Sequence, residues 1–307
     1  MSERSGYKSG VPCWVDLSST DVTLSVRFYR EIFGWEAVFD PRPEAGGHGR
    51  FTLRGKAVAG IGPSRGDGGS SVWNTWVATE DAGLTAARVR EAGGEVVVEP
   101  AGVFGEGAMT VVRDPSGASV TAWQVGPRQG AEIVGEPGAL AWNELVTRDT
   151  ARCGAFYPAV FGWGVKDVDG AGGRCVEWQV DGHPVAGMTE SGPRVPPDTP
   201  PHWLAYFAAE DVDATVARAE ELGGTVVLPR TPAPRGPVAV LADPQSALFA
   251  VVGPDRPPAV SPAVRRPADG PPARAGHGPA GTGPARAEHE SDPAPSPGQV
   301  DLSCGVS

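Results

Sequence analysis

"FYREIFGW" occupies residues 28–35 and "FYPAVFGW" occupies residues 156–163, so one aromatic phrase occurs twice in this chain. The similarity continues beyond the phrase. "WNTWVATEDAGLTAARVREAGGEVVVEP" (73–100) parallels "WLAYFAAEDVDATVARAEELGGTVVLPR" (203–230), and "VVRDPSGASVTAW" (111–123) parallels "VLADPQSALFAVV" (240–252). A nearly constant spacing over such a length indicates a duplicated domain.

Each copy is itself built from two similar halves. An alternating strand is followed by Ser, Thr or Asp, then by an amphipathic helix, a Gly and three short strands. In the first helix Val22, Val26, Tyr29 and Phe33 fall on one face, and Gly34 ends the helix. The strands are expected at 35–40, 50–54 and 56–62, and again at 95–99, 108–113 and 118–124. The pattern is therefore βαβββ twice in each copy.

The second copy departs from the first at one helical position. Pro158 stands where the first copy has Arg30. Proline inside a helix removes a hydrogen bond and clashes with the preceding turn. The sequence therefore predicts a kinked or shortened last turn there.

The internal repeat and the composition of the tail divide the chain into five segments. The sequence predicts an N-terminal extension (1–10), a first module (11–126), a linker (127–138), a second module (139–253) and a tail (254–307). The tail has 12 prolines and no Phe, Trp or Tyr. Such a segment buries too little apolar surface to offset its chain entropy, which predicts disorder.

Charge and hydropathy exclude several classes of function. The net charge of −11 argues against a nucleic-acid or anionic-membrane partner, because phosphate contacts need clustered Lys and Arg. No apolar run approaches the roughly 20 residues of a membrane span. The polar start "MSERSGYKSG" has no apolar run behind it, so a cytoplasmic location is expected. The four cysteines form no C-x-x-C pair of the zinc-site type.

Paired βαβββ units that carry the FY-x-x-x-FGW phrase, a Gly-Gly pair and an Asp-Pro turn resemble the vicinal oxygen chelate superfamily. This superfamily contains glyoxalase I, bleomycin-resistance proteins and extradiol dioxygenases. The resemblance covers 11–126 and 139–253. It implies an α+β fold of two tandem modules, in which the paired units of each module form an open, cup-shaped sheet around a ligand. Single-module relatives often pair units between two chains, so a monomer or a homodimer is expected here. Whether the units pair within or across modules is left open.

Enzymes of this superfamily usually hold a divalent metal on His or Glu at three or four fixed positions. Carried over to this chain, those positions fall at or beside Trp14, Asn74 and Thr121 in module 1, and Trp142, Leu204 and Ala250 in module 2. None of these is His or Glu, so the resemblance predicts a lost metal site and no cofactor. A weaker alternative is a divalent-metal site rebuilt from His183, His202 and Glu144.

Aromatic residues and carboxylates are the remaining candidates for a site. The predicted ligand-binding residues are Trp14, Asp16, Trp76, Trp123, Trp142, Glu144, Trp203 and Tyr206, and Trp73 and Trp178 are assigned to the same cup-lining strands. Asp16 alternates with Trp14, and Glu144 with Trp142, so each pair should face one side of its strand. Trp combines a large apolar face with one N–H donor, which suits flat organic molecules and cations. Core packing is the alternative role for each Trp.

Two main hypotheses follow. The first is a metal-independent binding protein of the sequestering or resistance type, which holds an aromatic or cationic small organic molecule in Trp-lined cups. The alternative is an enzyme (lyase, isomerase or dioxygenase) with a rebuilt metal site, or with Asp16 or Glu144 as the catalytic general base. A third, weaker hypothesis makes the tail a docking arm for a protein partner.

Overall fold

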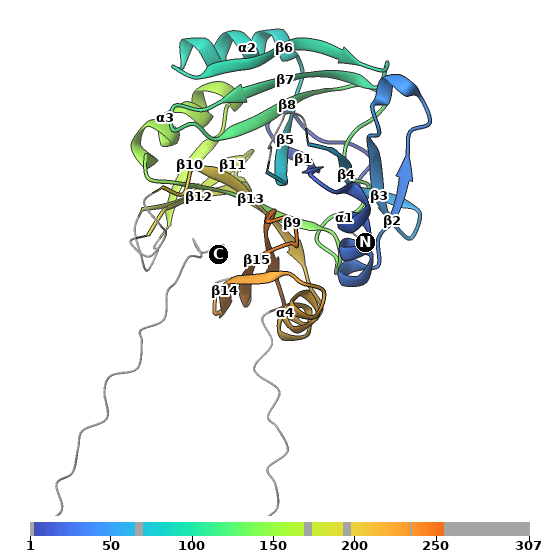
Figure 1. Cartoon of the computed structure of the whole chain (residues 1–307). Helices are drawn as coiled ribbons and strands as arrows, with labels where there is room; N and C mark the ends of the chain where they lie inside the picture. Colours follow the sequence, from blue (N-terminus) through green and yellow to red (C-terminus); the bar gives the residue numbers. More distant parts are fainter. Residues whose placement is uncertain (1–2, 65–69, 169–173, 193–197, 234, 255–307) are drawn as a thin grey trace, which may run out of the picture. The chain divides into compact units, whose positions relative to one another are not determined.

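A computed structural model of the chain describes residues 3–64, 70–168, 174–192, 198–233 and 235–254 (Figure 1). The predicted disordered tail, 254–307, lies outside the described residues from 255 onward. No helix in the described ranges is both long enough and apolar enough to cross a membrane.

Both modules show the predicted order βαβββ–βαβββ. Module 1 contains β1 (Pro12–Ser19), α1 (Val22–Phe33), β2 (Glu36–Phe39), a 3₁₀ turn η1 (Pro43–Ala45), β3 (Gly49–Leu53), β4 (Lys56–Pro63), β5 (Val72–Thr79), α2 (Ala82–Glu91), β6 (Glu95–Val103), β7 (Gly107–Arg113) and β8 (Ser119–Val125). Module 2 contains β9 (Leu140–Thr147), α3 (Thr150–Phe161), β10 (Gly164–Val168), β11 (Cys175–Val180), β12 (His183–Glu190), β13 (His202–Ala208), α4 (Val212–Glu221), β14 (Thr225–Thr231), β15 (Val238–Ala242) and β16 (Leu248–Val252). The α+β class and the duplication are confirmed.

The strands of each module form one eight-stranded sheet. The orders are β2-β3-β4-β1-β5-β8-β7-β6 and β10-β11-β12-β9-β13-β16-β15-β14. The two halves of a module meet through the antiparallel pairs β1–β5 and β9–β13. The strand pairing left open by the sequence therefore runs within each module.

Local signals explain where the helices begin and end. The side chains of Asp21 and Asp149 accept hydrogen bonds from the first turns of α1 and α3, while Gly34 and Gly162 end these helices at φ 71°. Only glycine adopts that left-handed conformation without strain. Of the kinked or shortened last turn predicted at Pro158, the shortening is wrong, and the kink stays a prediction. α3 continues to Phe161, because the N–H of Gly162 still reaches the carbonyl of Pro158 at 2.9 Å.

The main apolar cores lie between the two modules, on the helix-bearing faces of the sheets. One cluster joins Phe28 and Tyr29 of α1 with Val212 and Ala219 of α4. A second cluster joins the α2 side of module 1 with the α3 side of module 2, and α2 lies against α3 (Figure 1). Strands thus pair within a module, whereas helices pack across modules.

The repeated motifs contact each other across this boundary. The hydroxyl of Tyr29 donates to Asp243 Oδ2 at 3.1 Å and accepts from Trp73 Nε1 at 2.9 Å. In the reciprocal set, the hydroxyl of Tyr157 donates to Asp114 Oδ2 at 2.8 Å and accepts from Trp203 Nε1 at 2.9 Å. The aromatic phrase of each module therefore hydrogen-bonds the Asp-Pro turn of the other.

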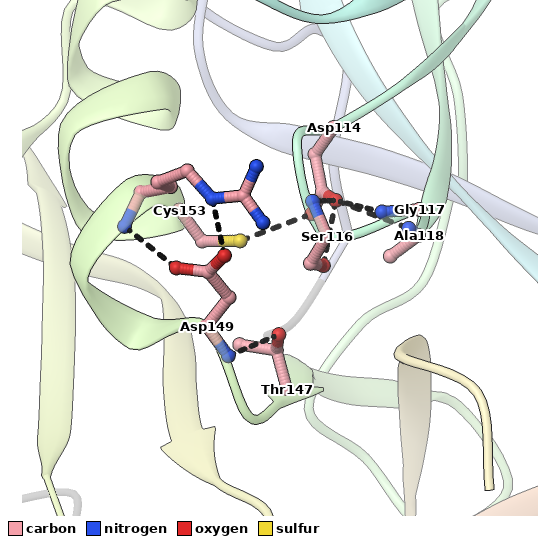
Figure 2. Close-up of polar contacts among 8 residues, drawn as sticks. Asp114, Ser116, Gly117, Ala118, Thr147, Asp149 and Cys153 are labelled. Atoms are coloured by element: carbon pink, nitrogen blue, oxygen red, sulfur yellow. Dashed lines mark hydrogen bonds and ion pairs between the residues drawn. The ribbon is translucent and has the colours of Figure 1, made fainter. Parts of the chain in front are cut away.

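The Asp-Pro turn is organised to hold its carboxylate in place. Asp114 Oδ1 accepts from the backbone N–H groups of Ser116, Gly117 and Ala118 at 2.8, 2.9 and 3.0 Å (Figure 2). Its other oxygen faces α3 of module 2, where the Sγ of Cys153 lies 3.6 Å away. The turn is therefore a buried docking element between modules.

Candidate ligand-binding faces

The helices pack against one face of each sheet, and every second residue of a strand points to the opposite, helix-free face. On this side module 1 carries Trp14, Asp16, Asn74, Trp76 and Trp123, which we call the module 1 face. Module 2 carries Trp142, Glu144, Glu177, Leu204 and Tyr206, which we call the module 2 face. Seven of the eight predicted ligand-binding residues lie on these two faces.

Trp203 is the exception, and its predicted place in the cup is corrected. Leu204 and Tyr206 point to the helix-free side of β13, so Trp203 points to the other side. It is 4% exposed in the inter-module core, where its N–H is bonded to Tyr157. Trp73 and Trp178 belong to the inter-module cores for the same reason. All three tryptophans lie on the side of their strands opposite to the helix-free face.

Asp16 is the polar centre of the module 1 face. Its Oδ1 accepts a hydrogen bond from Trp76 Nε1, and Asn74 Nδ2 lies 3.5 Å from its Oδ2. Burial raises the pKa of Asp16, and these two hydrogen bonds partly offset that effect. The guanidinium of Arg128 stacks on Trp14 at 4.4 Å from the ring centroid and lies 3.6 Å from Glu106 Oε2. This face is therefore a set of polar groups that already satisfy one another.

Glu144 occupies the corresponding place in module 2. It is 2% exposed, and the hydroxyl of Tyr206 donates to its Oε2 at 2.5 Å. Burial raises the pKa of Glu144 to about 8, and the Tyr206 hydrogen bond opposes this shift only in part. At neutral pH Glu144 is therefore mostly protonated, so it can both donate and accept a hydrogen bond.

Glu177 on β11 is a second carboxylate of the module 2 face, and the sequence analysis missed it. It is 2% exposed and accepts from Gln179 Nε2 at 2.8 Å. Lys166 Nζ and a guanidinium nitrogen of Arg235 lie 3.7 Å from its two oxygens. Arg235 also stacks on Trp142, 4.1 Å from the ring centroid. The available signal was a Glu inside the apolar strand "CVEWQV", two positions from Gln179 and on the opposite side of the strand from Trp178.

Comparisons with known proteins agree with this architecture. Residues 14–121 match the model of the Glyoxalase/Bleomycin resistance protein/Dioxygenase superfamily, and residues 142–252 match that of the Glyoxalase-like domain. The anthracycline biosynthesis protein DnrV of Streptomyces peucetius is 40% identical over 260 residues, which cover 80% of this chain and 94% of that protein. The chain belongs to the glyoxalase/bleomycin resistance/dioxygenase superfamily.

Two solved structures of this superfamily share the fold. The Mn(II)-bound glyoxalase from Novosphingobium aromaticivorans has a TM-score of 0.58 at 16% identity, with 80% of this chain and 83% of that chain covered. The 2,2',3-trihydroxybiphenyl 1,2-dioxygenase from Sphingomonas wittichii has a TM-score of 0.57 at 15% identity, with coverage of 80% and 91%. The glyoxalase carries a metal on this fold, so the expectation of no cofactor, which came from the sequence alone, is corrected.

The residues of this chain were tested against such a metal site. The expected ligand positions are Trp14, Asn74 and Thr121 in module 1 and Trp142, Leu204 and Ala250 in module 2, and the sheet register places Asp16 beside Asn74 and Glu144 beside Leu204. Each module therefore offers a single carboxylate near these positions, and the described ranges contain no group of three or more His, Cys, Asp or Glu side chains that could hold a metal ion. These residues do not fit the metal sites of the superfamily.

The alternative set of His183, His202 and Glu144 is not assembled either. In the sheet register Glu144 lies beside Gly187, and His183 is four residues farther along β12, about 13 Å away at strand spacing. His202 pairs with Val146, and its Nδ1 is 2.9 Å from the carbonyl of Pro200. The prediction of a rebuilt site from these three residues is therefore corrected.

Proposed function

We propose that the chain binds a flat, multi-ring organic molecule on its helix-free faces, with the module 2 face as the principal site. The carrying observation is the set of Trp142, Tyr206 and the buried, protonated Glu144 on neighbouring strands. Aromatic side chains supply stacking area, and a neutral carboxyl supplies a hydrogen bond without the cost of a buried charge.

The relationship to DnrV supports the chemical class of this ligand. DnrV is named for anthracycline biosynthesis and aligns with both modules of this chain. Anthracyclines contain fused planar rings that bear oxygen substituents. A face with indole, phenol and carboxyl groups is suited to such a surface, in line with the aromatic ligand expected from the sequence.

Isothermal titration with 2-hydroxyanthraquinone tests the proposal. We expect saturable binding that Trp142→Leu weakens at least tenfold, because the indole provides much of the contact area. Phe39→Leu is the matched control, since Phe39 is 44% exposed on the edge strand β2 of module 1. Absence of binding by the wild-type chain, or equal affinity in Trp142→Leu, would refute the proposal.

A second candidate function is proton transfer to or from the bound molecule. The specific observation is the 2.5 Å bond between Tyr206 and Glu144, whose pKa of about 8 lies close to neutral pH. A general acid or base is most effective when its pKa lies near the working pH. Glu144→Gln keeps the shape and loses the titrating proton, so it should abolish turnover of a phenolic ring substrate while retaining its binding. Turnover that persists in Glu144→Gln would exclude Glu144 as the proton carrier.

A further inference from the structure

Two polar atoms of the module 2 face have no hydrogen-bond partner among the described residues. They are Nε1 of Trp142 and Oε2 of Glu177, on side chains that belong to residues 8% and 2% exposed. Folded proteins pair nearly all buried polar atoms, and each one left unpaired costs about 1–3 kcal/mol. One unpaired donor and one unpaired acceptor on the same face point to a ligand that forms a hydrogen bond with each of them.

The sheet register brings these groups together around one glycine. Glu177, Gly187 and Glu144 stand side by side on β11, β12 and β9, so the two carboxyls flank a residue without a side chain. At strand spacing their Cα atoms are about 10 Å apart. A Cβ atom at Gly187 would lie 3.1 Å from Trp142 Nε1 and 3.3 Å from Glu144 Oε1. The absence of a side chain at Gly187 therefore lets the N–H of Trp142 and the carboxyl of Glu144 lie close against the backbone of β12.

The charges around Glu177 indicate which kind of group donates a hydrogen bond to its Oε2. Lys166 and Arg235 each lie 3.7 Å from this carboxylate, so the three charged groups already sum to +1. An added ammonium group would raise this net positive charge further, whereas a hydroxyl would supply the missing hydrogen bond without any charge. A neutral hydroxyl is therefore the preferred partner.

We propose that the module 2 face is specific for planar ring compounds bearing both a hydroxyl and a carbonyl group. The hydroxyl donates to Glu177 Oε2, and the carbonyl accepts from Trp142 Nε1. This assignment rests on the proposed function, since it names the groups that a ring compound on that face presents.

The module 1 face differs at two of the same three positions. Arg50, Gly60 and Asp16 form the equivalent row, and Asp16 already accepts from Trp76. Among the described residues, module 1 has no buried side-chain nitrogen or oxygen without a partner. The hydroxyl-and-carbonyl preference therefore belongs to module 2 alone.

The test compares three ring compounds of similar size by titration calorimetry at pH 6: 2-hydroxyanthraquinone, anthraquinone and 2-hydroxyanthracene. We expect wild-type chain to bind the first at least tenfold more tightly than either analogue, because a buried partner stays unpaired in each analogue complex. Glu177→Met should remove the preference for the hydroxyl, and Trp142→Phe the preference for the carbonyl. Glu95→Gln is the control, because it removes an ion-paired but exposed carboxylate on a strand of module 1.

The outcomes separate this inference from the proposed function. Binding of all three compounds within twofold would overturn the specificity and leave ring binding intact. Failure of all three to bind would overturn both. If Glu177→Met does not fold, the affinities of the three compounds for the wild-type chain still test the specificity. A tenfold preference unchanged in Glu177→Met and Trp142→Phe, both folded by circular dichroism, would also overturn the assignment.

Discussion

Glu144 should make the stability of this protein depend on pH in an unusual direction. Its pKa is raised by burial from 4.5 to about 8, and each tenfold change in proton affinity is worth about 1.4 kcal/mol. The unfolded chain releases this proton near pH 4.5, whereas the folded chain holds it until about pH 8. Stability is therefore complete below pH 4.5 and falls as pH rises toward 8, by up to about 5 kcal/mol.

Glu144→Gln isolates this effect, because glutamine is neutral at every pH and its carbonyl still accepts from Tyr206. The free energy of unfolding, measured by urea titration at pH 5, 6, 7 and 8, should decline in wild type relative to Glu144→Gln by about 1.4 kcal/mol per pH unit. Glu220→Gln, at an exposed position of α4, is the control and should show no such trend. A constant difference between wild type and Glu144→Gln from pH 5 to pH 8 would refute the raised pKa.

Four further outcomes are expected. Tyr157→Phe should lower the free energy of unfolding by about 1–3 kcal/mol, because Asp114 and Trp203 each lose a buried hydrogen bond. Gly94→Ala should cost about 1–3 kcal/mol, because its Cβ would lie 2.6 Å from Phe156 of the other module. Gly187→Ala should weaken binding of 2-hydroxyanthraquinone severalfold in calorimetry, because its methyl group would lie 3.1 Å from Trp142 Nε1 and displace the indole. The isolated fragment 1–126 should not fold as a monomer in circular dichroism and gel filtration, because its helix faces lose their partners.

Each of these outcomes has a control or a contrary result. Gly102→Ala is the control for Gly94→Ala: no atom lies within 4 Å of its Cβ, so its effect should stay within about 0.5 kcal/mol. An unchanged urea midpoint in Tyr157→Phe would show that the inter-module hydrogen bonds contribute nothing net. Unaltered affinity in Gly187→Ala would place the ligand elsewhere. Cooperative unfolding of a monomeric 1–126 fragment would contradict the shared core.

The duplicated βαβββ pattern was predictable because it depends on local signals. Periodic apolar residues, an Asp before a helix and a Gly after it act within one turn of chain, so they can be followed along the sequence. The carboxylates Asp16 and Glu144 were also predictable, because alternation with Trp14 and Trp142 sets the side of the strand to which they point.

The site was predicted less completely than the fold. Alternation separates Trp203 from Tyr206 on β13, but which side of a strand carries the helices depends on how the sheet packs against distant elements. Trp203 was therefore assigned to the wrong face, and Glu177 was missed. The stacking of Arg235 on Trp142 could not be foreseen, since a loop 93 residues away along the chain supplies the cation.

The sequence by itself determined that the chain is a duplication, that each copy contains two βαβββ units, and where most helices and strands lie. Only the tertiary structure decided that strands pair within a module while the repeated FY and Asp-Pro motifs contact the other module. The physical reason is that periodicity indicates which face of a helix or strand is apolar. It does not indicate whether that face packs against the same module or against the similar other module. The two modules offer equivalent apolar faces, so the choice depends on how the whole chain packs.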